Sequence, residues 1–411
     1  MPSMKTKQTE RTDMRARPGW RSTCGAVAAA AALATLTGTV APAAAGAGVS
    51  DPWVYSWGQN ASGELGNGSV VEQHTPGPVQ GLAREDVKEL GAGGAGNTGG
   101  FAVALLKNGT LKSWGDNKYG QLGNGSTLAR SFPAAVTGLH DAKSIAVGCW
   151  HALALKGGRV WAWGRNDNGQ LGDGTTGAKD TGAAKPVPVQ GLDKVKAVAA
   201  GCNFSMALRQ DGTVWTWGAN DRGQLGLGTN AVHNTPQKVP ELGDVTALAP
   251  GSLHSAVLTA DHTVQAWGAG SSGQLGNDGV ADSSTPVAVK HLEGVEKLVG
   301  GAHTDFALLS DGSVKGWGSN NNGQLGDGTT TNRTTAMPID GLKGVQDVVS
   351  GQRHTVALLD DHSVVAWGFN ANGQLGNGST ESAGKPATTL AANSGVQHLA
   401  AGRNANFTFA Y

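Results

Sequence analysis

Hydrophobic positions in this chain fall in short segments that are separated by glycines and turn-forming pairs. Residues 195–200, 204–208 and 213–217 are three such segments, each rich in β-prone residues, and Asp211-Gly212 precedes the third. An Asp-Gly pair between two segments of this kind is typical of a β-hairpin. Residues 235–239 come next and contain a proline, which favours an outer edge strand because a missing backbone N–H is tolerated there. The pattern predicts a small antiparallel sheet of about four strands in roughly 50 residues.

The same unit recurs along most of the chain. A Trp-Gly pair appears at intervals of 49 to 57 residues, and Gly-Gln-Leu-Gly begins six residues after the tryptophan in every copy but the first, which reads Gly-Glu-Leu-Gly. A fixed motif with flanking loops of variable length indicates one folding unit copied seven times. The tryptophans of the motif are Trp57, Trp114, Trp163, Trp217, Trp267, Trp317 and Trp367.

The two ends of the repeat region are complementary halves of one unit. Residues 53–57 match only the third strand of a unit, with the rest of that unit after it, whereas residues 396–411 match the first two strands of a unit. One such sheet cannot bury both of its faces, and stacking the sheets in a ring removes their free edges. The sequence therefore predicts an all-β fold for residues 53–411: a seven-bladed β-propeller with four-stranded blades, the last closed by N- and C-terminal strands. An open β-solenoid is the alternative, but it needs polar caps.

Composition supports this fold class, and the repeat assigns its motif a structural role. The chain has 65 glycines among 411 residues, 39% hydrophobic residues and three cysteines. So much glycine argues against helical solenoids, the hydrophobic content argues against disorder, and three cysteines are too few for a disulfide scaffold. In Gly-Gln-Leu-Gly we expect the glycines to supply positive φ or close backbone approach. We expect the leucine and the tryptophan to fill the layer between neighbouring blades.

The N-terminal region has the pattern of a secretory signal peptide. Residues 1–21 carry six basic side chains, residues 24–40 form an uncharged Ala-rich stretch, and Ala43-Ala44-Ala45 supply small residues for cleavage. A basic region, an apolar region and a small-residue cleavage site together define such a peptide. A single-pass anchor is the alternative, but the stretch is short and Ala-dominated for a span of about 20 apolar residues.

We expect residues 1–45 to be removed, residues 46–52 to form a short linker, and the mature protein to be secreted. Met14 is an alternative start to Met1. Cleavage removes six basic and two acidic residues and leaves 25 basic against 29 acidic ones, a net charge near −4. A mildly acidic protein is a poor candidate for nucleic-acid binding, which needs clustered Lys and Arg. No later apolar run is long enough to span a membrane, so we expect no membrane association after cleavage.

The repeat resembles the regulator-of-chromosome-condensation repeat family over residues 53–411. The pattern Gly-x-x-His-x-x-Ala-Leu appears here as Gly351 to Leu358, and Asp-Gly-x-Val-x-x-Trp-Gly-x-Asn-x-x-Gly-Gln-Leu-Gly appears as Asp211 to Gly226. The resemblance implies a seven-bladed propeller with a split closing blade. The family's founding activity is nucleotide exchange on a small nuclear GTPase. We do not expect that activity here, because export removes the chain from any such GTPase.

Two further resemblances bear on function. The chain looks like secreted bacterial propellers that inhibit β-lactamases by covering the active site with one face. Plant UV-B photoreceptors of this fold use clusters of additional tryptophans on one face. The additional tryptophans here are dispersed, so we expect no photochemistry; they are Trp53, Trp150, Trp161 and Trp215.

Three variable columns mark a candidate partner-binding surface. Alignment of the units on the Ala-Leu pair identifies the family histidine position and the two positions before it. Symmetry brings equivalent positions together, so we expect these residues to ring one mouth of the central channel. The columns contain aromatic residues and arginine, which are enriched in protein interfaces; solvated loop ends without a partner are the alternative. The expected partner-binding residues are Trp150, His151, Asn203, Phe204, Leu253, His254, His303, Arg353, His354 and Arg403.

The same columns raise two chemical questions. His151, His254 and His354 occupy the family histidine position. Zinc binding is one interpretation, but positions one or more blades apart are too distant for ligands at about 2.1 Å from one metal. We therefore expect each histidine to bond the backbone of a neighbouring blade. Cys149 and Cys202 share a column in adjacent blades; export permits a disulfide between them, and two buried thiols are the alternative.

The sequence carries no recognisable catalytic or cofactor-binding motif. It contains no Ser-His-Asp order, no paired-carboxylate motif, no His-Glu-x-x-His and no P-loop. We therefore expect a monomeric, non-enzymatic scaffold, without cofactor or metal, that binds an unknown extracellular protein through one propeller face. A secreted enzyme inhibitor, similar to the β-lactamase inhibitors, is one alternative. A carbohydrate-active enzyme with its site in the central channel is the other.

Overall fold

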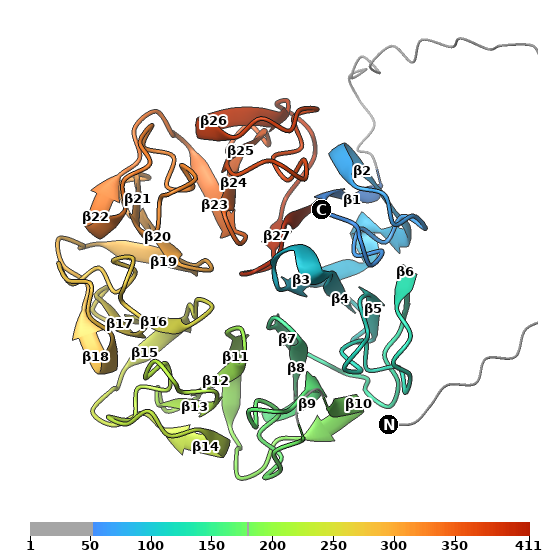
Figure 1. Cartoon of the computed structure of the whole chain (residues 1–411), viewed down its shortest axis with the longest axis vertical. Coiled ribbons are helices and arrows are strands. Elements are labelled where there is room, and N and C mark those ends of the chain that lie inside the picture. Colours follow the sequence, from blue (N-terminus) through green and yellow to red (C-terminus); the bar gives the residue numbers. More distant parts are fainter. Residues whose placement is uncertain (1–51, 179–180) are drawn as a thin grey trace, which may run out of the picture. The chain divides into compact units, whose positions relative to one another are not determined.

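Seven four-stranded antiparallel sheets stand around a central axis in the computed structural model, which describes residues 52–178 and 181–411 (Figure 1). The strand order in each sheet follows the chain from the axis outwards in six blades. We number these blades one to six from β3, and the blade that contains both chain ends is blade seven. The expected signal peptide (1–45) lies outside the described residues.

Each blade has an inner strand, two middle strands and an outer strand. The inner strands are β3 (Val87–Gly94), β7 (Ser144–Val147), β11 (Val195–Ala200), β15 (Val245–Leu248), β19 (Val295–Gly300), β23 (Val345–Ser350) and β27 (Leu399–Ala401). The second strands are β4 (Gly100–Leu106), β8 (His151–Lys156), β12 (Phe204–Arg209), β16 (His254–Thr259), β20 (Thr304–Leu309), β24 (His354–Leu359) and β28 (Phe407–Ala410).

The third strands carry the motif tryptophans, and the outer strands carry most of the prolines. The third strands are β1 (Trp53–Gly58), β5 (Leu111–Gly115), β9 (Arg159–Arg165), β13 (Val214–Gly218), β17 (Val264–Gly268), β21 (Val314–Gly318) and β25 (Val364–Gly368). The outer strands are β2 (Gln73–Ala83), β6 (Arg130–Ala135), β10 (Gly182–Pro188), β14 (His233–Lys238), β18 (Ser283–Ala288), β22 (Arg333–Pro338) and β26 (Ala383–Leu390). Two short 3₁₀ helices, η1 (Arg84–Asp86) and η2 (Gly96–Thr98), flank β3.

The split closing blade that the sequence predicts is confirmed. Strand β1 pairs antiparallel with β28, so that Tyr55 lies opposite Ala410 and Trp57 opposite Thr408. The order in this sheet is β2-β1-β28-β27, and Figure 1 shows the blue and red ends of the described chain side by side. The N-terminal strand therefore supplies the third position of a blade whose first two strands come from the C-terminus.

The motif tryptophans join each blade to the preceding one. All seven side chains are fully buried. In blade seven, Trp57 donates its indole N–H to the backbone oxygen of Gln374 in blade six (2.9 Å), and Trp114 donates to Glu64 across the seam (2.8 Å). The other five tryptophans make the equivalent bond at 2.9–3.1 Å. The expected position of the tryptophans between blades is confirmed.

The leucine and glycines of the motif fill the same layer. The motif leucines are at most 1% exposed, and each lies in a hydrophobic cluster with the tryptophan of the next blade. Gly66 has φ +68°, and a Cβ there would lie 2.7 Å from the indole nitrogen of Trp114. A side chain at this glycine would therefore force neighbouring blades apart, as well as strain the backbone.

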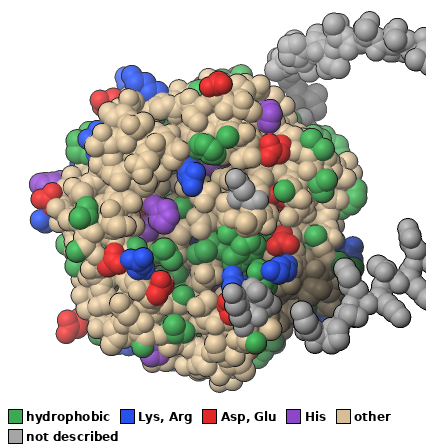
Figure 2. All heavy atoms as spheres, in the orientation of Figure 1, with side chains coloured by type: hydrophobic (Ala, Val, Ile, Leu, Met, Phe, Trp, Pro, Cys, Tyr) green, Lys and Arg blue, Asp and Glu red, His purple; other side chains and the backbone are tan. Residues whose placement is uncertain are grey.

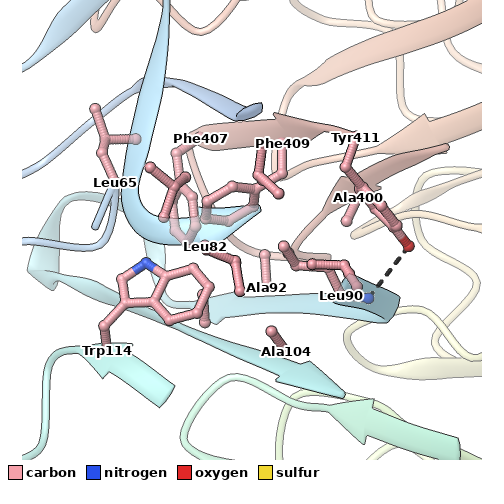
Figure 3. Packing of buried hydrophobic residues seen from close by; sticks show 14 of the residues in the cluster. Leu65, Leu82, Leu90, Ala92, Ala104, Trp114, Ala400, Phe407, Phe409 and Tyr411 are labelled. Atoms are coloured by element: carbon pink, nitrogen blue, oxygen red, sulfur yellow. Dashed lines mark hydrogen bonds between the residues drawn. The ribbon is translucent and has the colours of Figure 1, made fainter. Parts of the chain in front are cut away.

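The seam between blades seven and one has an especially aromatic core (Figure 3). Phe407 and Phe409 of β28 lie against Trp114, and the rings of Trp114 and Phe409 meet edge to face with centroids 5.7 Å apart. Tyr411 accepts the backbone N–H of Leu90 on its hydroxyl oxygen (3.2 Å). The last residues of the chain thus contribute to the core on both sides of the closing blade. Within residues 52–178 and 181–411, no helix is long and apolar enough to cross a membrane.

Candidate functional site at the channel mouth

The turns between the inner and second strands meet at one end of the central channel, which we call the channel mouth. In successive blades, backbone N–H groups donate to the equivalent position in the next blade: Cys149 to Cys202 (3.1 Å), Cys202 to Ser252 (3.1 Å) and Ser252 to Ala302 (3.0 Å). These bonds hold the turns close together, and we call the narrow part that they surround the neck. The expectation that the three columns meet around one end of the channel therefore holds for the backbone of these blades. In the closing blade it is wrong by two residues, because Gln352 donates to Ala405 (3.0 Å) and not to Arg403.

Four of the expected partner-binding residues are inaccessible. His151, Phe204, His254 and His354 begin their strands and are fully buried. Successive side chains of a strand point to opposite faces of the sheet, and at this position the side chain enters the layer between blades. The expectation that these four line a partner-binding surface is therefore wrong.

The buried histidines bond the next blade through side chains, so the expected backbone partner is also wrong. The Nε2 atom of His151 lies 2.9 Å from the Ser205 hydroxyl, which itself donates to the Gln170 carbonyl (2.8 Å). That hydroxyl oxygen is thus the acceptor, and His151 donates. Burial lowers the pKa of His151 to about 3, which keeps the ring neutral. In the described part of the chain, no three His, Cys, Asp or Glu side chains are grouped for metal binding.

His354 makes the same contact in blade six, and His254 in blade four contacts a carboxyl group instead of a hydroxyl. The Nε2 atom of His354 lies 2.8 Å from the Thr408 hydroxyl. The Nε2 atom of His254 instead lies 3.0 Å from both carboxylate oxygens of Asp305, which is fully buried. Burial raises the pKa of Asp305, whereas His254 and then Arg403 oppose that increase. Asp305 is a site residue that the sequence reasoning missed, because it lies one position after the family histidine position and so outside the three aligned columns.

Arg403 extends from the closing blade across the neck. Its Nη1 donates to the Ala200 carbonyl in blade three (3.0 Å). Burial lowers the pKa of Arg403 to about 10, and Asp305 opposes this, so the guanidinium stays charged at neutral pH. Beside it, the amide of Asn404 lies 3.4 Å and 3.5 Å from the sulfurs of Cys149 and Cys202. Side chains from blade seven therefore fill part of the neck.

The remaining expected residues reach the surface of the mouth. Arg353 is exposed, and Trp150, Asn203, Leu253 and His303 are partly exposed. Burial, together with the smaller effects of the His254 and Arg353 charges, lowers the pKa of His303 to about 4, so this imidazole is neutral at physiological pH. The exposed cation of this ring is thus Arg353.

Aromatic side chains that the sequence reasoning missed support two of these residues. Trp150 meets Tyr119 edge to face with centroids 5.6 Å apart, and the guanidinium of Arg165 lies 4.9 Å from the Tyr119 ring centroid. In blade six, the guanidinium of Arg353 lies 5.7 Å from the ring centroid of Phe369. Figure 2 shows hydrophobic side chains gathered beside the middle of this face, with basic and histidine side chains nearby.

A sequence signal for these supporting residues exists two positions after each motif tryptophan. Arg165 and Phe369 hold this position, and their backbone N–H groups donate to the carbonyls of Trp150 (2.9 Å) and Arg353 (2.8 Å). The residue at this position varies between blades, and its backbone contacts the turn at the mouth. These positions therefore form a second ring of residues around the mouth. Tyr119 lies one position before the Gly-Gln-Leu-Gly motif, in another variable column.

Comparison with known protein families identifies the family of this chain. A sequence model of the family described as the RCC1-like domain matches residues 53–409. The chain belongs to the RCC1-like domain family. Among solved structures, this RCC1-like domain is similar to Prp20p from Saccharomyces cerevisiae (TM-score 0.76, 21% identity, 88% of this chain and 92% of that one). It is also similar to human WBSCR16 (TM-score 0.77, 23% identity, 88% and 98%). These likenesses show a shared fold.

Two relatives with higher sequence identity match this chain over only part of their own length. Human E3 ubiquitin-protein ligase HERC2 is 31% identical over 194 residues, which are 46% of this chain and 4% of that protein. The Ultraviolet-B receptor UVR8 from Arabidopsis thaliana is 32% identical over 187 residues, which are 45% of this chain and 41% of that protein. The matched region therefore spans less than half the length of either relative.

Cys149 and Cys202 form a disulfide between blades two and three of this RCC1-like domain. The Cα atoms are 4.5 Å apart, and the sequence separation is 53 residues. The structure thus contains the first of the two alternatives that the sequence left open. Because a disulfide restricts the unfolded chain, replacing both cysteines by serine should lower stability by about 2–4 kcal/mol.

Thiol titration provides the direct check of this disulfide. Denatured but unreduced protein that lacks residues 1–45 should show no reactive thiol, and reduction should release two. Two thiols before reduction would contradict the bridge. Cys24→Ser in the full chain removes the third cysteine of the sequence and should give the same two counts.

Glu64 is the motif residue that departs from the repeat. The six glutamines at this position accept the N–H of the residue two positions earlier at 2.8–2.9 Å. Glu64 keeps this bond from Ser62 (2.6 Å), but its Oε1 has no partner among the described residues. Burial raises the pKa of Glu64 to about 7, against the opposing effect of its backbone bonds.

Replacing Glu64 by glutamine should stabilise the protein at neutral pH. An unfolded carboxyl titrates near 4.5 and the folded one near 7, so between these values the unfolded state loses its proton first. The wild type therefore loses about 3 kcal/mol of stability as pH rises through this window, and Glu64→Gln does not. Urea unfolding at pH 4, 6 and 8 measures the difference. The converse change Gln274→Glu should introduce the same decline, and parallel pH curves for wild type and Glu64→Gln would contradict the assignment.

Proposed function

We propose that this RCC1-like domain is an exported, non-enzymatic scaffold that binds a partner protein through the channel-mouth face. The observation that carries the proposal is the pair of supported anchors on this face. Trp150 lies against Tyr119, and Arg353 lies over Phe369. Tryptophan, tyrosine and arginine are the residues most often found at energetic hot spots of protein interfaces. Side chains already held in place lose little conformational freedom on binding.

The chemistry of the mouth favours binding over catalysis. None of the residues in the three columns is Asp or Glu, and the carboxylate behind them, Asp305, is bonded to His254. Glycoside hydrolysis needs a pair of carboxylates that flank the scissile bond. The fold also fits a binding role, since Prp20p, a structural relative, is described by its binding properties to Gsp1p and histones.

Capture from culture supernatant tests the proposed function. Immobilised protein lacking residues 1–45 should retain a partner, and Trp150→Ala or Arg353→Ala should weaken its affinity by roughly 30-fold, the effect of a hot-spot residue. Trp53→Ala is the matched control, because Trp53 is 43% exposed and lies at the end of β1 away from the mouth. Equal capture by both mouth variants, or turnover of a glycan by the wild type, would contradict the proposal.

A further inference from the structure

We propose that the channel mouth recognises a carboxylate side chain of the partner protein through Arg353 at the rim, with the charge of Arg403 at the neck adding to the attraction. This inference rests on the proposed function and specifies the chemistry of the partner. The occupant is an acidic segment of a protein that also carries apolar residues.

At the rim, Arg353 is a charged group available to a partner. Its side chain is exposed and its guanidinium lies over the Phe369 ring. Among the ion pairs formed by described residues, none involves Arg353. Arginine recognises carboxylates through two parallel N–H donors, so a carboxylate is the natural complement of this rim.

At the neck, two buried donors lack an acceptor. Ser252 is 1% exposed, and neither its hydroxyl nor the Nε of Arg403 has a partner among the residues that the structure describes. Arg403 bonds Ala200 in blade three and acts electrostatically on Asp305 in blade five. Ser252 belongs to blade four, which lies between them. The Arg403 guanidinium stays charged and therefore adds a second positive charge to the mouth.

The positive charges of the two arginines at the mouth are not balanced by the carboxyl group inside it. Asp305 is held by His254 at 3.0 Å on both oxygens, and it also faces Arg403. His303 adds no negative charge. Arg353 and Arg403 thus oppose one internal carboxylate, and an incoming carboxylate balances the excess.

Beside the arginines, blades three and four carry small or apolar side chains at the mouth. Leu253 in blade four is partly exposed, and the second-ring positions of blades three and four are Ala219 and Ala269. Their backbone N–H groups donate to Asn203 and Leu253. Leu253 is therefore the apolar side chain of these two blades that an apolar residue of the partner would contact. With so few cations, the mouth does not suit a nucleic acid, whose binding needs many phosphate contacts.

Selection from a random peptide library displayed on phage tests the inference on the protein lacking residues 1–45. Selected peptides should be enriched in Asp or Glu, and replacing that residue by its amide in a synthetic peptide should weaken binding by about tenfold. Arg353→Glu should reverse the preference towards Lys and Arg. Arg130→Glu, an exposed arginine of the outer strand β6, should leave it unchanged, and melting curves should show that both variants fold.

The outcomes separate this inference from the proposed function. If the selected peptides show no preference for Asp or Glu but no longer bind Trp150→Ala, recognition of a carboxylate is contradicted. The mouth is then still the binding face. If the selected peptides bind both Trp150→Ala and Arg353→Ala as they bind the wild type, the proposed function and the carboxylate inference are both contradicted. Competition by acetate, combined with full binding of the amide peptide, would mean that the mouth takes a free anion and would overturn recognition of a partner side chain. A selection that yields no peptide would also overturn the inference.

Discussion

Removal of residues 395–411 should abolish cooperative folding. This segment supplies β27 and β28, and its large side chains lie in two of the clusters between blades. Burying five such side chains at about 2 kcal/mol each contributes about 10 kcal/mol, comparable with the total stability of about 5–15 kcal/mol of a folded domain. The five are Val396, Leu399, Phe407, Phe409 and Tyr411.

Circular dichroism during heating measures this effect, and a peptide supplied in trans is its control. The truncated chain should melt without a cooperative transition. A synthetic peptide of residues 395–411 should restore the transition by pairing with β1, whereas a scrambled peptide of the same composition should not. A truncated chain with a wild-type melting curve would show that ring closure does not stabilise the fold.

The blade number and the closing blade can be predicted from the sequence because the repeat provides its own internal comparison. Seven copies of one motif reveal which positions are constant, and constant positions such as Trp217 and Leu225 are buried between blades. The complementary ends reveal the closure, since strand pairing is a property of the backbone. These features depend on spacing along the chain, which a sequence records directly.

The chemistry of the mouth is harder to predict, because it depends on contacts between blades. A shift of one position along a strand moves a side chain to the opposite face, and this separates the accessible Trp150 from the buried His151. The pairing of His254 with Asp305 joins residues 51 positions apart. Phe369 supports Arg353 only because their turns are adjacent in the folded blade. The spacing of the motifs along the chain predicts none of these side-chain contacts.

Replacing Trp217 by alanine should cost about 3–5 kcal/mol, the usual loss for a large aromatic side chain in a core. The side chain is fully buried in a cluster with Leu171 and Leu153 of blade two. A cavity at this place would lie inside the hydrophobic cluster that blades two and three share. Urea unfolding measures the loss. Trp215→Ala is the matched control, because Trp215 lies on the same strand and borders the same cluster but is partly exposed.

Trp217→Phe separates the hydrogen bond from the packing. The indole N–H donates to the Gln170 carbonyl (2.9 Å), and the Ser205 hydroxyl donates to the same oxygen (2.8 Å). Loss of the indole donor therefore leaves the carbonyl with a partner, and the bond itself should account for only about 1 kcal/mol. Most of the alanine effect should then come from volume, so phenylalanine should recover much of the stability. A phenylalanine variant as unstable as the alanine variant would instead make the ring of indole bonds the main connection between blades.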